Sequence, residues 1–377
     1  MLKLFQCTNL GGMEKASLLV LEALRAEGHA CSILTPRPFG PAAERIRALD
    51  AKAADHPYRG KFGVWSQRSF EGVVRRRHRT GEPIWITGTD VACLRAVAPL
   101  RGPKVLAHHY HHFEGAGSWL RWKLFYELGC RQLNQLTYPS EFTRQEAIRI
   151  APWVEARSQV APGFFPVTSD TASRESQQQA ARAHLGIPAD ALVVGNAGWL
   201  TRRKRWDVFL KTCGLLAREV PEARFFVVGG GPERDRLGNL AAELGIADRV
   251  TFTGWTQDVQ SYFKAFDFLL FNSDFDTLPR TPGEAMGAGC LVVASLVYGG
   301  LAELVEHERN GLLFRQHDPE QCCAALLELY RHPAACARLR EAAWETLRQR
   351  YSHEAAVAPY RTFLAKAGRG EPEGLPS

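Results

Sequence analysis

The stretch Asn272–Gly289, NSDFDTLPRTPGEAMGAG, follows an apolar run and leads into a helix, which is typical of an α/β fold. The apolar run, Asp267–Phe271, predicts a buried parallel strand. A helix is predicted to begin near Pro282–Gly283, because proline suits a first turn and glycine lets the backbone approach a ligand closely. The positive end of that helix favours a phosphate. Asp276 and Glu284, eight positions apart, then supply carboxylates for sugar or ribose hydroxyls.

Size and composition indicate an ordinary globular chain of two or three domains, with 377 residues, 45% of them hydrophobic and 23% charged. The net charge of +7 fits an anionic ligand or membrane surface and is too small to indicate nucleic acid. No apolar run reaches the roughly 18–20 residues of a spanning helix. The N-terminus is not typical of a signal peptide, and the nine scattered cysteines favour a reduced, cytoplasmic protein.

Strands and helices alternate in two series. The first starts with strand Leu2–Cys7, the loop Gly11–Gly12 and helix Met13–Glu27, and the second starts with strand Leu192–Gly198. Gly11–Gly12 lacks the third glycine of a dinucleotide fingerprint, so it is either a tight turn or a phosphate or sugar contact. Further strands are predicted at His29–Thr35, Ile84–Thr87, Val105–His109, Leu136–Ser140, Arg224–Val228, Arg249–Thr253 and Cys290–Ala294, and further helices at Glu141–Ile150, Trp206–Glu219, Glu233–Leu244, Pro319–Tyr330 and Arg338–Tyr351.

The two series predict two doubly wound, Rossmann-like domains that face a central cleft. We expect the first domain over residues 1–165, a Ser/Gln-rich linker over 166–189 and the second domain over 190–351. A C-terminal helix at about 352–367 is expected to pack back on the first domain, and 368–377 to be a disordered tail.

Two basic stretches and one histidine cluster have several interpretations. Arg75–Arg79 and Trp119–Lys123 are either solvated helix faces or a surface attracted to anionic lipid. The cluster His108–His112 could bind a substrate hydroxyl or developing charge, hold a metal, or be a polar loop without a chemical role. Arg202–Arg205, four basic residues before a helix, are either a solvated turn or include an anion contact.

Taken together, five segments resemble the retaining glycosyltransferases of family 4, which have the GT-B fold: Gly11–Glu14, Lys204, Gly229–Pro232, Asp276–Glu284 and Gly299–Glu303. The resemblance extends to Gly28–His29, Ser140–Glu141, Pro162–Gly163 and Asn310–Leu313, so that it covers nearly the whole chain.

The resemblance implies a nucleotide-sugar donor, UDP- or GDP-linked, held mainly by the second domain, and a glycan or lipid-linked acceptor held by the first. Glu284 would bind the ribose, Asp276 the donor sugar, and Lys204 the diphosphate. Trp199 stands where the family commonly has an arginine, so Arg202, Arg203 or Arg280 would supply that charge. The donor-binding residues implied are Gly12, Arg203, Trp255, Arg280, Thr281, Pro282, Gly283 and Glu284, and the catalytic residues are Lys204, Asp276 and one of His108 and His109.

The activity implied is transfer of a hexosyl or N-acetylhexosaminyl group with retention, without metal or other cofactor, in bacterial lipopolysaccharide or surface polysaccharide synthesis. The triplet Asp274–Asp276 could alternatively hold Mn²⁺ or Mg²⁺ beneath a diphosphate. The location implied is the cytoplasm, with peripheral contact to the inner face of the plasma membrane as a further hypothesis. The alternatives are a non-catalytic sugar-nucleotide-binding protein and a GT-B relative such as a sugar-nucleotide epimerase.

Overall fold

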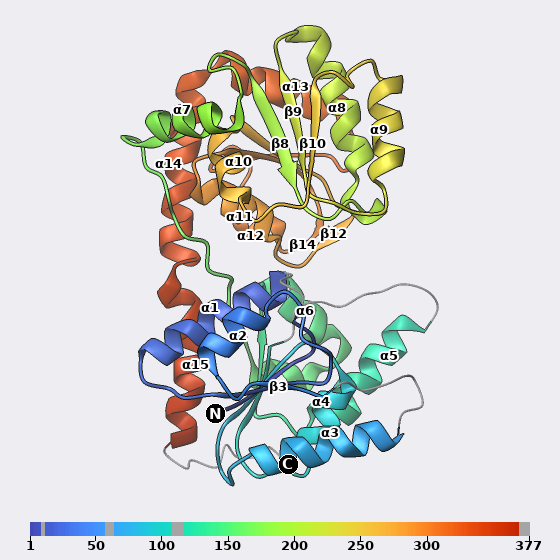
Figure 1. Cartoon of the computed structure of the whole chain (residues 1–377), viewed down its shortest axis with the longest axis vertical. Coiled ribbons are helices and arrows are strands. Elements are labelled where there is room, and N and C mark those ends of the chain that lie inside the picture. Colours follow the sequence, from blue (N-terminus) through green and yellow to red (C-terminus); the bar gives the residue numbers. More distant parts are fainter. Residues whose placement is uncertain (9–11, 57–63, 108–116, 369–377) are drawn as a thin grey trace. The chain divides into compact units, whose positions relative to one another are not determined.

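The computed structural model describes residues 1–8, 12–56, 64–107 and 117–368, which fold as two compact units (Figure 1). Unit 1 comprises Met1–Phe164 with His353–Ser377, and unit 2 comprises Phe165–Ser352. Each unit contains one large parallel sheet, which confirms the predicted α/β class. Of the tail predicted over 368–377, only Gly368 belongs to the described residues.

The sheet of unit 1 has seven parallel strands in the order β3-β2-β1-β4-β5-β6-β7. Its strands are β1 Leu2–Phe5, β2 Ser32–Thr35, β3 Ala54–Asp55, β4 Ile84–Thr87, β5 Lys104–Ala107, β6 Gln135–Tyr138 and β7 Ser158–Val160. Strand β1 lies between β2 and β4, with Leu2 paired to Ser32 and Ile84. Every residue of β1, β4 and β5 is buried, as expected of parallel strands covered on both faces.

The helices of unit 1 cover this sheet, and the C-terminal helix is one of them. They are α1 Gly12–Ala26, α2 Ala43–Leu49, α3 Val64–Arg77, α4 Val91–Val97, α5 Ser118–Leu124 with a π-helical extension at Phe125–Cys130, α6 Glu141–Ile150, a 3₁₀ helix at Pro152–Arg157, and α15 His353–Gly368. Tyr360 of α15 packs its ring 4.3 Å from that of Trp85, and its hydroxyl is 3.1 Å from Thr137 Oγ1. Helix α15 therefore completes the core of unit 1, although nearly 200 residues separate it from the rest of that unit.

The sheet of unit 2 has six parallel strands in the order β10-β9-β8-β11-β13-β15. They are β8 Val193–Ala197, β9 Arg224–Val228, β10 Val250–Gly254, β11 Phe268–Phe271, β13 Leu291–Ser295 and β15 Leu312–Phe314, and a separate two-stranded ribbon pairs β12 Phe275–Asp276 with β14 Tyr298–Gly299. Counted along the chain, this order is 3-2-1-4-5-6, the order of the dinucleotide-binding fold.

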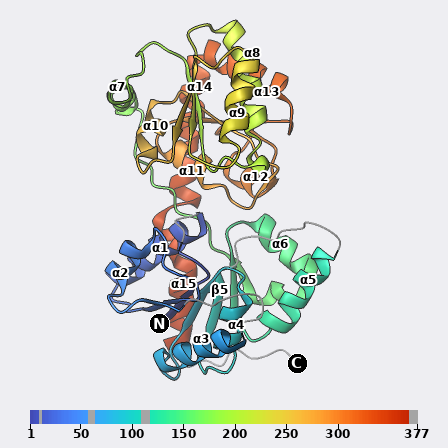
Figure 2. The ribbon, with the colours of Figure 1, turned by 45° about the vertical axis from the view of Figure 1, so that its right-hand side comes forward.

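Helices cover both faces of the unit 2 sheet (Figure 1, Figure 2). Side chains of α8 Trp206–Glu219, α9 Arg234–Glu243 and α13 Pro319–Arg331 form the apolar core on one face. The core on the other face takes side chains from α7 Arg174–Leu185, α10 Val259–Ala265, α11 Arg280–Gly287, α12 Leu301–Leu304 and α14 Pro333–Arg350. The helices cover the two faces of the sheet. The carboxyl ends of its parallel strands lie along one edge, where the loops that follow the strands begin.

Several predicted boundaries agree with the structure at both ends. Strands β4 and β9 and helices α6 and α8 have the bounds that the sequence predicted. Ser140 is the N-cap of α6, because its Oγ accepts the Thr143 N–H at 3.2 Å. The helix predicted near Pro282–Gly283 instead begins at Arg280, since the Thr281 hydroxyl donates to the Ala197 carbonyl at 3.1 Å and fixes the earlier start.

The Ser/Gln-rich stretch predicted as a linker contains helix α7, and two buried arginines bind this helix to unit 2. Arg174 donates to the carbonyl oxygens of Gly289 at 2.8 Å and Phe266 at 3.0 Å. Arg182 pairs with Asp267 at 2.7 Å. Because guanidinium groups, rather than a stripe of apolar side chains, make these contacts, hydrophobic periodicity gave no sign of them.

Unit 1 contains a buried lysine at the centre of its sheet. Lys3, on β1, is fully buried, and its Nζ donates to Thr87 Oγ1 and lies 3.6 Å from the Trp85 ring centroid. Burial lowers the pKa of Lys3 well below its ordinary value. The unfolded chain therefore binds a proton at pH 7 that the folded chain holds less tightly, which lowers the free energy of unfolding.

We expect Lys3→Met to raise the free energy of unfolding at pH 7 by about 1–2 kcal/mol, because it removes a buried amine and keeps the volume. The difference from wild type should shrink as the pH rises toward about 10.4 and should be small above it, where the unfolded lysine has also lost its proton. Urea unfolding of both proteins at pH 7 and pH 10.5 measures this. Lys52→Met, at an exposed position, is the control and should change little. A Lys3→Met protein less stable than wild type at pH 7 contradicts the expectation.

Among the described residues, no helix is both long enough and apolar enough to cross a membrane.

Candidate functional site

The strand order of unit 2 locates the candidate site. The order reverses between β8 and β11, and open α/β sheets bind ligands beyond the carboxyl ends of the strands at such a point. The chain that leaves β8 carries the 3₁₀ turn Arg202–Lys204, and the chain that leaves β11 carries Asp276. The sheet therefore brings together two segments that the sequence analysis had singled out separately.

Lys204 and Asp276 form an ion pair at this edge. The ammonium of Lys204 donates to Asp276 Oδ2, and the two side chains are only 17% and 18% exposed. Arg203 Nη1 lies 3.6 Å from the same oxygen and donates to the Phe275 carbonyl at 2.8 Å. The sequence offers Arg202, Arg203 and Arg280 in place of the family arginine. Arg203 lies beside Asp276, the partner of Lys204. Arg202 is 88% exposed and lies 3.6 Å from Glu233.

A short parallel ribbon fixes the position of Asp276. In the pairing of β12 with β14, Phe275 lies opposite Tyr298 and Asp276 opposite Gly299. Gly299 has a φ of 141°, and a Cβ atom at this position would overlap the Asp276 carbonyl oxygen. The Gly300 N–H also donates to the Thr277 carbonyl at 2.8 Å. The glycine loop before α12 is thus required by its close approach to the Asp276 backbone.

Glu284 is paired with Arg280 on the same helix, α11. Arg280 Nη2 lies 2.9 Å from Glu284 Oε1, and the side chains are 14% and 15% exposed. The first turn of α11 is flanked by Pro279 and contains Pro282, so only Arg280 and Thr281 supply N–H groups that the helical ladder itself does not use. The helix start thus combines two backbone donors with a neighbouring carboxylate.

Gly283 has a packing role that sequence reasoning missed. It was interpreted as a point of close approach to a ligand. It is buried, and a Cβ atom there would lie 2.6 Å from the ring of Phe165, which is 1% exposed. The contact between Phe165 and α11 therefore explains why position 283 is a glycine. A contact between Gly283 and the sugar-nucleotide donor remains a prediction.

The other predicted site residues are placed as follows. Trp255 follows β10 and is 68% exposed, and Trp199, beside the basic turn, is 70% exposed. Gly12 begins α1 in unit 1 and is exposed. His108 and His109 lie outside the described residues, so the three interpretations of the histidine cluster stay open.

The carboxylates of the Asp274–Asp276 triplet face different cations. Asp274 Oδ1 lies 3.3 Å from Arg205 Nη1, whereas Asp276 binds Lys204. Within the described ranges, no group of three or more His, Cys, Asp or Glu side chains could hold a metal ion. The two ion pairs place both carboxylates beside the basic turn.

Comparison with known proteins gives the family. Residues 177–346 match the model for "Glycosyl transferases group 1", and residues 10–166 match that for "Glycosyltransferase Family 4". The chain therefore belongs to the family 4, group 1 glycosyltransferases.

Individual relatives agree with this assignment. The chain is 36% identical to the lipopolysaccharide core biosynthesis glycosyltransferase LpsD of Rhizobium meliloti over 180 residues, which cover 48% of this chain and 51% of that one. It is 35% identical over 213 residues to the D-inositol 3-phosphate glycosyltransferase of Streptomyces avermitilis, covering 53% and 46% of the two chains. The chain thus spans about half the length of the curated relatives it matches.

A solved structure extends the likeness over the whole fold. Anabaena Alr3699/HepE, solved in complex with UDP, superimposes with a TM-score of 0.81 at 19% identity, over 97% of this chain and 99% of that one. With the strand orders above, this confirms the predicted pair of Rossmann-like sheets of the GT-B type.

We expect Gly283→Ala to lower the free energy of unfolding by about 1–3 kcal/mol, because the added methyl group overlaps Phe165. Helix propensity alone predicts the opposite sign, since alanine is favoured over glycine within a helix. Gly72→Ala, in α3, is the matched control: its Cβ would meet only the flexible end of Arg76 at 3.4 Å, and stability should rise by up to about 1 kcal/mol. Chemical unfolding measures both variants. Equal stabilisation by the two would show that Phe165 does not restrict position 283.

Proposed function

We propose that the chain is a retaining glycosyltransferase, which moves a hexose or N-acetylhexosamine from a nucleotide-sugar donor to a hydroxyl of a glycan or lipid-linked acceptor. The observation that supports this most directly is the set of charges at the switch point of unit 2, where Lys204 and Arg203 meet Asp276 and where α11 begins beside Glu284. A basic turn suits a diphosphate, and half-buried carboxylates suit hydroxyl groups.

Donor binding would exchange one anion for another. Asp276 is the counter-charge of Lys204 in the ion pair. A diphosphate that binds Lys204 and Arg203 would take over this role and release Asp276 to accept hydrogen bonds from the donor sugar. In the same way, Glu284 would bind the ribose hydroxyls while Arg280 stays beside it.

The transfer step needs charge stabilisation more than a protein base. The bond between the anomeric carbon and the phosphate oxygen breaks, and the acceptor oxygen bonds to that carbon on the same face. The acceptor's proton passes to the departing phosphate. Negative charge that develops on this phosphate would be stabilised by Lys204 and Arg203, so the step as proposed does not require a metal ion.

The donor base and the setting are also proposals. The UDP in the HepE structure supports UDP among the candidate nucleotides, with GDP as the alternative. The name of LpsD supports a place in lipopolysaccharide synthesis. Surface polysaccharide synthesis is the alternative setting, and the cytoplasmic side of the membrane is the proposed location. A thermal-shift screen against UDP, GDP, ADP and CMP would identify the nucleotide, since a ligand at a hundredfold excess over its Kd stabilises the protein by about 2.7 kcal/mol.

We expect Lys204→Met and Glu284→Gln to lower kcat/KM for sugar transfer by about 10²–10³-fold while the fold is kept, by analogy with the loss of one charge-stabilising donor. Transfer from UDP-glucose and related donors to a lipid or glycan acceptor pool, followed by nucleotide release, measures this. Lys211→Met, an exposed lysine of α8, is the control.

Wild-type turnover in Lys204→Met would contradict the assignment. Binding of a sugar nucleotide by wild type without hydrolysis or transfer would instead favour the non-catalytic binding protein.

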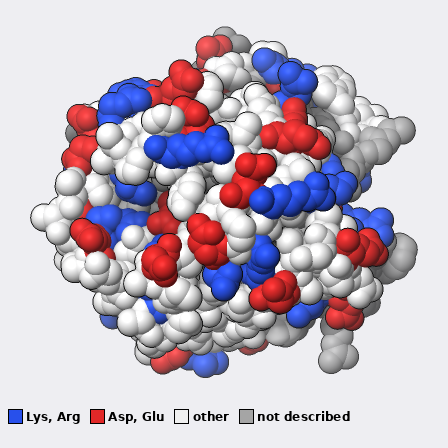
Figure 3. All heavy atoms as spheres, turned by 90° about the horizontal axis from the view of Figure 1, so that it is seen from above, with Lys and Arg blue, Asp and Glu red and all other residues white. Residues whose placement is uncertain are grey.

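Peripheral membrane contact is the second part of the proposal, and α5 with its π-helical extension is the surface that supports it. Trp119, Leu120 and Leu128 are 53%, 55% and 79% exposed, and Leu124 is 47% exposed. The basic residues Arg121 and Lys123 belong to α5, and Arg131 directly follows the extension. Lys123 and Arg131 both pair with Glu127, at 3.7 and 2.8 Å. Aromatic and aliphatic side chains beside basic ones suit the headgroup region of an anionic bilayer. The face drawn in Figure 3, which is the view of Figure 1 from above, mixes acidic and basic side chains.

We expect the double variant Trp119→Gln, Leu128→Gln to sediment several-fold less with phosphatidylglycerol vesicles than wild type, because it removes apolar area from the contact. Val91→Gln, which changes another exposed apolar side chain of unit 1, should bind as wild type does. Neutral phosphatidylcholine vesicles should retain little of any variant. Equal sedimentation of wild type and the double variant would exclude α5 as the contact.

A further inference from the structure

Two residues beside the candidate site have an unusual backbone and touch each other. Among the described residues, the non-glycine positions with positive φ are Arg205 at 46°, Glu308 at 61° and His317 at 63°. Arg205 Nη1 contacts His317 Nδ1, although 112 positions separate the two residues. A left-handed backbone crowds the Cβ of an L-residue, so it persists where surrounding contacts hold it.

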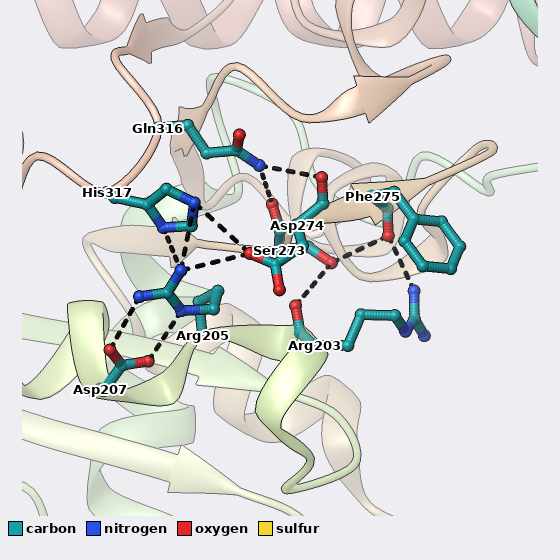
Figure 4. A network of polar contacts seen from close by, with 8 residues as sticks. All are labelled: Arg203, Arg205, Asp207, Ser273, Asp274, Phe275, Gln316 and His317. Atoms are coloured by element: carbon teal, nitrogen blue, oxygen red, sulfur yellow. Dashed lines mark hydrogen bonds and ion pairs between the residues drawn. The ribbon is translucent and has the colours of Figure 1, made fainter. Parts of the chain in front are cut away.

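The side chains of both residues converge on Asp274 (Figure 4). Arg205 makes two 3.0 Å bonds to Asp207 and lies 3.3 Å from Asp274 Oδ1. His317 Nε2 lies 3.5 Å from the same Asp274 oxygen. Arg205 Nη1 also lies 3.1 Å from His317 Nε2, so the guanidinium faces the edge of the ring that carries both nitrogens.

Backbone contacts join the same three segments. Gln316 Nε2 donates to the carbonyl oxygens of Ser273 and Asp274, both at 2.9 Å. The Asp274 N–H donates to the Arg203 carbonyl at 2.9 Å. The segment after β15 is thus hydrogen-bonded to the segment after β11. That segment is in turn hydrogen-bonded to the basic turn after β8.

We propose that Arg205 and His317 are positioning residues, which with Asp274 form a clamp that sets the spacing between Lys204 and Asp276. Arg205 directly follows Lys204, and Asp274 lies two positions before Asp276, so each clamped residue fixes one partner of the ion pair. The guanidinium of Arg205 is already held by two carboxylates, which suits a structural contact better than a ligand contact. The role in donor binding rests on the proposed function, whereas the clamp itself does not.

Glycine substitutions test the contribution of the side chain alone, because glycine adopts the positive φ without strain. Arg205→Gly and His317→Gly remove the clamp but tolerate positive φ, so folding should be retained. His317→Asn is the conservative variant, because asparagine tolerates this backbone and its amide oxygen can accept from Arg205. Glu308→Gly is the matched control: it relieves the same kind of backbone at a side chain that is 79% exposed.

The first readout is amide hydrogen exchange in the peptide over residues 272–279, without ligand. Arg205→Gly and His317→Gly should exchange at least about tenfold faster there than wild type, because loss of the clamp frees the Asp274 amide. Glu308→Gly and His317→Asn should exchange as wild type does. Unchanged exchange in both clamp variants would overturn the proposal.

The second readout is calorimetric titration with UDP, together with kcat and KM for transfer. Misplacement of catalytic groups by about 1 Å costs about 100-fold in rate, so we expect kcat/KM for transfer to fall by about that factor in both clamp variants, and UDP to bind them more weakly than wild type. Faster exchange with wild-type UDP affinity would overturn the positioning role. If wild-type protein binds none of UDP, GDP, ADP and CMP, the proposed function fails, and the exchange measurement still decides whether the clamp exists.

Discussion

The crowding of positive charge in Arg202–Arg205 is the constraint on which the candidate site depends. Four adjacent cations in a turn repel one another, and each is balanced by a carboxylate from elsewhere in unit 2. The pairs are Arg202 with Glu233, Arg203 and Lys204 with Asp276, and Arg205 with Asp207 and Asp274. The pairs with Asp274 and Asp276 hold the turn against the loop after β11, and the Lys204–Asp276 pair is partly buried, where charge pairs are stronger than in water.

The same balance of charge connects structure and function. In the proposed function, the ion-paired groups of this site are also the groups that a diphosphate and sugar hydroxyls would engage. The cation partner of Asp276 is Lys204, 72 positions away in the chain, and that of Glu284 is Arg280, 4 positions away. In that proposal the ligand's own anion would replace Asp276 beside Lys204, so that Lys204 keeps a counter-charge.

Glycines illustrate how far sequence reasoning reached at this site. The sequence indicates that Gly283 and Gly299 matter, but it does not show which contacts require a glycine at these positions. Gly283 makes room for Phe165, and Gly299 for the Asp276 backbone. A glycine is visible in a sequence, whereas the atom that would collide with its missing side chain belongs to a segment that only folding brings near.

The sequence by itself determined the α/β class, most strands and the candidate residues of unit 2, because apolar runs and their periodicity are properties of neighbouring residues. The tertiary structure decided which of these residues meet. It paired Lys204 with Asp276, buried Arg174 and Arg182 in a stretch that looked like a linker, and placed Arg205 and His317 in left-handed conformations. The physical reason is that sheet order, which no local pattern encodes, sets the contacts between residues tens of positions apart.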